Sequence, residues 1–151
     1  MNIINRSIKA LVLLFVLGST SVFATEQIHT GYFSNKAVSG YDVIAYFEQA
    51  KPVKGSSKHQ LEYKGADWYF SSQANLEKFK ANPEKFAPQY GGYCAWAMSN
   101  DKTAPGNAPF WTIYKEKLYL NYDQKILDKW IADKDGFIKK ADAHWAKADK
   151  E

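Results

Sequence analysis

The chain has 151 residues, of which 46% are hydrophobic, and a formal net charge of +4. This length allows one domain with a hydrophobic core. The charge is mild and no basic cluster appears, so the sequence gives no support to nucleic acid or a membrane surface as a partner. The single cysteine excludes an intramolecular disulfide. No phosphate-binding loop, serine-hydrolase arrangement or zinc-protease motif is present, so nothing indicates a kinase or hydrolase, and enzymatic activity stays open.

The first 24 residues have the pattern of a cleaved signal peptide. Arg6 and Lys9 place positive charge before an apolar run over residues 10–17, which is too short to cross a bilayer. Small or aliphatic residues precede the cleavage expected after Ala24. A retained membrane anchor is the alternative. We expect a periplasmic or secreted protein.

The next part of the chain predicts a β-hairpin. Val43–Phe47 is short and apolar, and its length does not decide between a strand and a helical turn. Residues 59–63 and 68–70 fit two strands, with a tight turn around Gly65 between them. Together these residues predict the first half of a small folded domain.

Short helices are expected after this hairpin. Two serines that follow it can cap a helix over residues 74–81. Pro83 suits the first position of a helical turn that continues over residues 84–89, because its missing N–H would be unpaired there. A third helix is expected from Tyr93 to Met98.

A second hairpin and a last helix complete the chain. Residues 110–114 and 117–121 alternate in the period of a half-buried sheet. Asp123 can cap a last, amphipathic helix. Gly136 lies within this helix and can kink or split it. The order of elements predicts an α+β fold, a single compact domain with two short β-hairpins and several helices. The predicted organisation is a signal peptide, a loose N-terminal lead-in and one domain, over residues 1–24, 25–37 and 38–148.

The stretch from Pro88 to Met98 concentrates the chemistry. It holds the only cysteine, Cys94, directly after Gly91-Gly92-Tyr93. Glycines permit positive φ angles and the close approach of another segment or a ligand. If a helix starts at Tyr93, free backbone N–H groups near Cys94 would lower the pKa of its thiol. A small, buried, unreactive side chain is the competing interpretation of Cys94.

Two residues are candidate partners of Cys94 in a metal site. Met98 follows four residues later, on the same helix face, and a thioether with a thiolate suits Cu(I). The imidazole of His59 could join the sulfur in a copper or zinc site. Alternatively, Met98 belongs to the core and His59 is an exposed strand histidine.

A ligand pocket is a second expectation. Three aromatic side chains of the stretch could line a cleft above the thiol or pack in the core. A carboxylate in an earlier turn could orient a ligand or cap its own turn. The predicted pocket residues are Tyr90, Gly91, Gly92, Tyr93, Trp96 and Asp42.

Several segments resemble the exported YHS-domain proteins over roughly residues 38–145. The segments that carry the resemblance are Ser39-Gly40-Tyr41-Asp42, Lys54-Gly55-Ser56-Ser57, Trp68-Tyr69-Phe70-Ser71-Ser72, residues 82–95, Leu118-Tyr119-Leu120-Asn121-Tyr122 and Trp145. The resemblance implies a small α+β domain. The wider group resembles cysteine-bearing metal-handling modules attached to copper and other heavy-metal transporters. Some exported relatives carry selenocysteine at the position that matches Cys94, which implies redox use of that atom.

One departure from the family pattern bears on metal binding. Metal-handling YHS modules place cysteines around the end of the aromatic strand, where this chain reads Phe70-Ser71-Ser72-Gln73. A multi-cysteine site is therefore not carried over by the resemblance.

Three hypotheses follow for the function. The first is a periplasmic protein that binds a soft metal ion, copper foremost, through Cys94 with Met98 or His59. The second is a thiol redox protein in which Cys94 is oxidised without a resolving cysteine in the chain. The third is a non-catalytic module that binds a ligand or partner in the aromatic cleft. The expected partner is a metal ion or small ligand, with no nucleic acid and no membrane span after signal cleavage.

Overall fold

A four-stranded sheet and a separate two-stranded sheet organise the structure, a computed structural model that describes residues 27–148. The predicted signal peptide over residues 1–24 lies outside the described residues. The larger sheet has the order β1-β2-β4-β3. Its strands are β1 (Thr30–Gly31), β2 (Ser34–Ala37), β3 (Ser56–Tyr63) and β4 (Ala66–Phe70).

The first two strands correct the expectation of a loose lead-in. β1 and β2 form an antiparallel hairpin in which Thr30 faces Ala37, and β2 pairs in parallel with β4 through Lys36 and Asp67. Strands of two and four residues are too short to show a period in the sequence. The pairing of β2 with β4, which follows much later in the chain, joins this hairpin to the larger sheet.

The hairpin of β3 and β4 confirms the predicted one. Lys64 and Gly65 occupy its turn with positive φ angles of 50° and 74°, as a tight two-residue turn requires. β4 buries alternate side chains, and Trp68 stacks on Phe79 with ring centroids 4.8 Å apart. This alternation places the larger core between the sheet and the helices that cover it.

Helices follow the capping signals of the sequence. α1 (Val43–Glu48) resolves the ambiguous apolar segment as a helix. Ser72 caps α2 (Gln73–Ala81) by accepting a hydrogen bond from the Asn75 N–H at 3.2 Å. Pro83 starts α3 (Pro83–Phe86), which ends three residues earlier than predicted.

The segment after α3 contains tighter turns than expected. The 3₁₀ turn η2 (Gln89–Gly92) precedes α4 (Ala95–Ser99), just as η1 (Val38–Gly40) precedes α1. The predicted helix start at Tyr93 is two residues early, because Tyr93 is extended and pairs with Pro105. Cys94 is therefore the residue that precedes the first turn of α4.

The second hairpin, of β5 (Asn107–Tyr114) and β6 (Lys117–Asn121), confirms the predicted pair. Leu118 and Leu120 of β6 pack into the core of the larger sheet, whereas Tyr119 belongs to a second core with the C-terminal helices. Opposite faces of one strand thus contact two cores.

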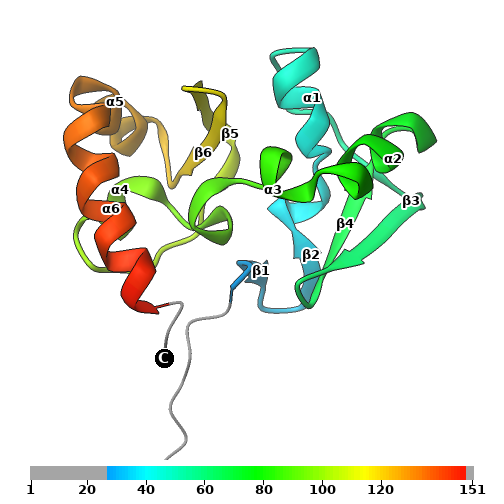
Figure 1. Ribbon diagram of the computed structural model, residues 1–151, viewed down its shortest axis with the longest axis horizontal. Coiled ribbons are helices and arrows are strands. Elements are labelled where there is room, and N and C mark those ends of the chain that lie inside the picture. The colour runs from blue at the N-terminus through cyan, green and yellow to red at the C-terminus, as the bar shows by residue number, and fades with distance from the viewer. Residues whose placement is uncertain (1–26, 149–151) are drawn as a thin grey trace, which may run out of the picture.

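The last predicted helix is two helices, α5 (Gln124–Ala132) and α6 (Lys134–Ala148). The chain breaks at Asp133 rather than at Gly136, and the Asp133 carboxylate caps α6 by accepting from the Gly136 N–H at 3.0 Å. In Figure 1 the helices α4 to α6 lie on one side of the β5–β6 hairpin, and α1, α2 and the larger sheet lie on the other.

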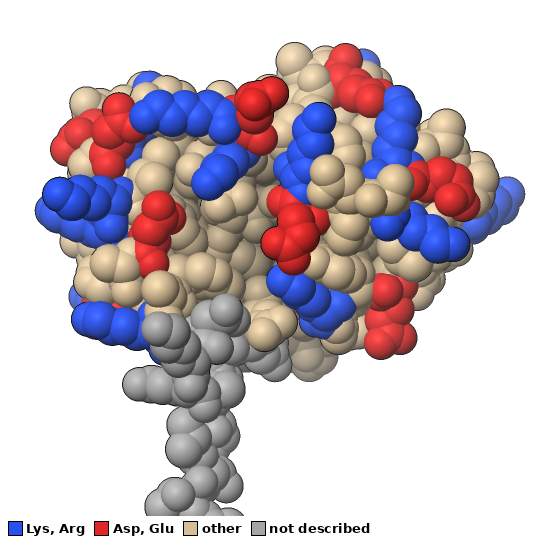
Figure 2. All heavy atoms as spheres, viewed as in Figure 1, with Lys and Arg blue, Asp and Glu red and all other residues tan. Residues whose placement is uncertain are grey.

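Charged side chains are mixed over the surface. Figure 2 shows Lys and acidic side chains interspersed on the visible face, without a broad area of one sign. Among the described residues no helix is both long and apolar enough to span a membrane.

Candidate functional site

A cavity lies where the N-terminal hairpin meets the segments on either side of α4. It has a volume of about 690 Å³. We call it the hairpin cavity. The residues that line it come from three segments of the chain, and they are His29, Thr30, Gly31, Tyr32, Phe33, Ser34, Asn35, Tyr93, Thr103, Ala104 and Pro105.

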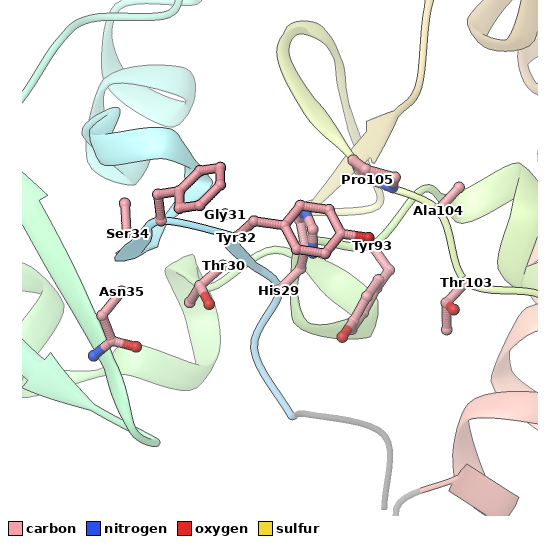
Figure 3. A pocket seen from close by; sticks show the side chains of 11 residues that line it. His29, Thr30, Gly31, Tyr32, Ser34, Asn35, Tyr93, Thr103, Ala104 and Pro105 are labelled. Carbon is pink, nitrogen blue, oxygen red and sulfur yellow. The ribbon is translucent and has the colours of Figure 1, made fainter. Parts of the chain in front are cut away.

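One wall is the β1–β2 hairpin. Tyr32 and Phe33 form its turn, and both side chains are fully exposed. Figure 3 shows Thr30 and Asn35 on the hairpin side of the cavity, with Tyr32 nearer the opposite wall. Two adjacent aromatic side chains without cover on a hairpin turn are unusual for a packed fold and mark a contact surface.

The other wall is held by backbone pairing around Tyr93. Tyr93 bridges Pro105, and the Cys94 N–H donates to the Ala104 carbonyl at 2.8 Å. The Tyr93 ring lies 5.0 Å from the His29 ring and 6.3 Å from the Trp145 ring. The two walls therefore touch where His29 meets Tyr93.

The glycine pair of the sequence supports this junction. The His29 N–H donates to the Gly91 carbonyl at 2.8 Å, and a Cβ added to Gly91 would overlap the Gln27 carbonyl. Gly92 accepts from the Gly106 N–H at 3.1 Å. The close approach expected of these glycines is thus to segments of the same chain.

Cys94 lies next to the cavity wall but is sealed in the interior. Cys94 is only 1% exposed to solvent. Its thiol donates a hydrogen bond to the Asn121 Oδ1, which lies 3.6 Å from the sulfur. Burial raises the pKa of the Cys94 thiol, although backbone hydrogen bonds from Ala97, Tyr122 and Trp96 favour the thiolate. Desolvation outweighs the helix-start effect that the sequence suggested.

Asn121, which the sequence analysis did not select, fixes the surroundings of the thiol. Its Oδ1 also accepts from the Trp96 N–H at 3.2 Å, which sets the orientation of the amide. Asn121 is fully buried, and its Nδ2 has no hydrogen-bond partner within residues 27–148. Only the three-dimensional pairing of Cys94 with Leu120 reveals this neighbour.

The three predicted metal ligands are not brought to one place. Met98 lies one helical turn from Cys94, since its N–H donates to the Cys94 carbonyl at 3.0 Å, and it is buried in the second core. His59 lies on β3, at the far side of Figure 1 from α4, with its Nδ1 3.3 Å from the Gln73 Oε1. Among the described residues no group of three or more His, Cys, Asp or Glu side chains lies close enough to hold a metal ion.

Of the predicted pocket residues, Tyr93 lines the hairpin cavity. Tyr90 is buried, its hydroxyl donates to the Asp142 Oδ1 at 2.8 Å, and burial together with this bond raises the pKa of its phenol. Trp96 lies under the Lys129 ammonium, 5.3 Å from the ring centroid. Asp42 lies in the larger core as the cap of α1. None of these three residues lines the hairpin cavity.

The buried thiol carries a testable expectation. In the folded protein, Cys94 should react with iodoacetamide at neutral pH about a hundredfold more slowly than in guanidinium chloride, because it is both inaccessible and protonated. Mass spectrometry of timed samples measures the two rates, and C94S controls for reaction at other residues. Similar rates in the two states would contradict the buried, protonated thiol.

The structure is a small α+β domain with a cavity beside one buried thiol. Residues 44–90 match the family model of the YHS domain, so this part of the chain is similar to that domain. Domains of this family are generally associated with metal binding and with copper. No curated protein and no solved structure matches the chain. The matched residues exclude both walls of the hairpin cavity as well as Cys94 and Met98.

Proposed function

We propose that this chain is an exported, non-catalytic binding protein that takes a small ligand in the hairpin cavity. The observation that carries the proposal is a cavity formed by three segments from different parts of the fold, a common setting for ligand sites. Three of its polar side chains, Thr30, Asn35 and Thr103, make no hydrogen bond with other described side chains or backbone. Export rests on the signal-peptide pattern of residues 1–24.

The chemistry of the lining favours binding over catalysis. The lining residues that the structure describes contain no carboxylate, amine or thiol, and the imidazole of His29 packs against Tyr93. Catalysis by a nucleophile or an acid–base pair needs such groups within reach of the substrate. The Cys94 thiol follows the lining residue Tyr93 in the sequence, but it is buried in the interior. Burial raises the pKa of this thiol and so favours its protonated form. Burial also weighs against thiol redox chemistry at this residue.

Truncating the Phe33 side chain at the hairpin turn tests the proposed site. F33A should keep the melting temperature of the parent protein, because Phe33 is fully exposed, and should weaken ligand binding by removing one wall. Ligand-observed NMR against a mixed library of neutral and charged metabolites measures binding. Y122A is the matched control, since Tyr122 is an exposed aromatic residue outside the cavity. Absence of any ligand, or equal binding by F33A and the parent, would contradict the proposal.

A second candidate function, soft-metal binding at Cys94, is favoured by the spacing of two sulfur-bearing residues. Cys94 and Met98 are sulfur-bearing side chains one helical turn apart in a buried environment. Thiolate and thioether ligands select Cu(I), and the family association with copper points the same way. His59 lies too far away to take part, so the candidate ligand pair is Cys94 and Met98.

Titration with Cu(I) under reducing conditions separates this candidate from the first. If the pair binds copper, the Cu(I) affinity should rise about tenfold per pH unit below the thiol pKa, because binding displaces the thiol proton. C94S should then lose binding, and M98L should weaken it while keeping the core volume. Unchanged affinity in C94S would exclude Cys94 as the copper ligand.

A further inference from the structure

We infer that the hairpin cavity and a second cavity beside it form one groove for a neutral oligosaccharide. The inference rests on the proposed function and adds the class of ligand. The second cavity, of about 320 Å³, shares Thr30 and Asn35 with the hairpin cavity. It extends the site to the β3–β4 turn at Lys64 and Gly65. A ligand longer than one ring can therefore contact both cavities at once.

The described lining of the groove offers an ionic ligand no unpaired side chain of opposite charge. Among the described residues that line the hairpin cavity there is no Asp, Glu, Lys or Arg. Those that line the second cavity include one, Lys64, and its ammonium already pairs with the Glu84 carboxylate at 3.3 Å. A charged ligand would lose hydration in this groove without gaining an opposite charge. The lining thus matches a ligand without net charge.

The polar groups of the groove match hydroxyl groups. Thr30 and Thr103 carry hydroxyls, and Asn35 carries an amide, so each can donate and accept a hydrogen bond. Sugar hydroxyls also do both. A purely apolar ligand would instead cover these groups without pairing them, at a cost for each. Asn35 stands between the two cavities, where it can contact neighbouring units of an oligomer.

The aromatic side chains supply the remaining surface of the groove. Tyr32 and Phe33 present their rings without cover at the hairpin turn, and Figure 3 shows the Tyr32 side chain on the side of the hairpin turn nearer Tyr93 in the opposite wall. Aromatic rings offer flat apolar faces with little conformational entropy to lose. The C–H faces of sugar rings pack on such surfaces while their edges hydrogen-bond. Hydroxyl, amide and aromatic groups without charge together define a saccharide site.

Calorimetric titration of the purified protein with β-1,4-linked glucose and N-acetylglucosamine oligomers, from single sugars to tetramers, tests the inference. Affinity should rise with oligomer length, because longer chains reach the second cavity. It should change less than about twofold between about 50 mM and 500 mM salt, since no ion pair contributes. N35A should weaken binding of the longer oligomers by about fivefold or more. Q60A is the matched control, an exposed amide on β3 at the opposite edge of the sheet.

The outcomes separate this inference from the proposed function. Binding of charged metabolites or of neutral peptides but not of oligosaccharides, with loss in F33A, would overturn the saccharide assignment and leave the binding function standing. Oligosaccharide binding that N35A and F33A leave unchanged would place the sugar elsewhere and overturn the groove. Failure of every probe, including the mixed metabolite library, would overturn both.

Discussion

Replacing Asp42 by alanine is expected to lower the free energy of unfolding by about 3 kcal/mol or more. The Asp42 carboxylate is fully buried and accepts four hydrogen bonds. Its donors are the Ile44 N–H at 2.9 Å, the Ser71 N–H at 2.9 Å, the Ser71 hydroxyl at 2.6 Å and the Asn75 Nδ2 at 2.8 Å. D42A would leave several of these donors without a partner in the interior. The carboxylate also ties the start of α1 to the end of β4, so the larger core loses a cross-link.

Urea unfolding monitored by tryptophan fluorescence measures this effect, and D123A provides the control. Asp123 caps α5 by accepting from the Ile126 N–H at 2.8 Å, so D123A reports the loss of a helix cap alone, about 1 kcal/mol. D42A should cost clearly more than D123A. Equal losses would mean that the bonds to Ser71 and Asn75 contribute nothing beyond the cap.

Replacing Gly91 by alanine is the second change with a large expected effect, a loss of about 3 kcal/mol in stability. Gly91 has a φ of +60°, and an added Cβ would overlap the backbone of Gln27. The substitution must therefore displace the segment that leads into β1. Since His29 bonds to the Gly91 carbonyl, the two walls of the hairpin cavity should separate and ligand binding should weaken as well.

Gly65 offers a matched control for the strain of a positive φ. Its φ is +74°, and nothing lies within 4 Å of an added Cβ. G65A should cost only about 1–2 kcal/mol. The difference in urea midpoint between G91A and G65A then reports the overlap with Gln27. A G91A protein as stable as G65A would show that the N-terminal segment does not depend on this contact.

Local sequence signals predicted much of the fold. The turn at Gly65, the cap at Ser72, the proline of α3 and the cap at Asp123 each act within a few residues, so they are readable in the sequence. The two main hairpins and the α+β class followed from them. The apolar segment of α1 was ambiguous because a short buried run suits a strand and a helix equally.

The site depended on contacts that the sequence does not display. Thr30 and Asn35 face Thr103 only because the N-terminal segment pairs with Gly91 and with β4. The sequence analysis centred the chemistry on Cys94, and the burial of this residue follows from its pairing with Leu120 and from Asn121. Tyr93 is the one predicted pocket residue that lines the cavity. For the other lining residues of the hairpin cavity, the sequence offered one signal. Tyr32 and Phe33 are adjacent aromatic residues in a segment with no clear period.

The position of β6 couples the two halves of the molecule. Because Leu118 and Leu120 fill one core while Tyr119 fills the other, loss of this strand would open both interiors together. The two halves of the molecule should therefore unfold together in one cooperative transition. The amides of β6 should also be among the slowest to exchange with deuterium, since they open only when the entire domain does.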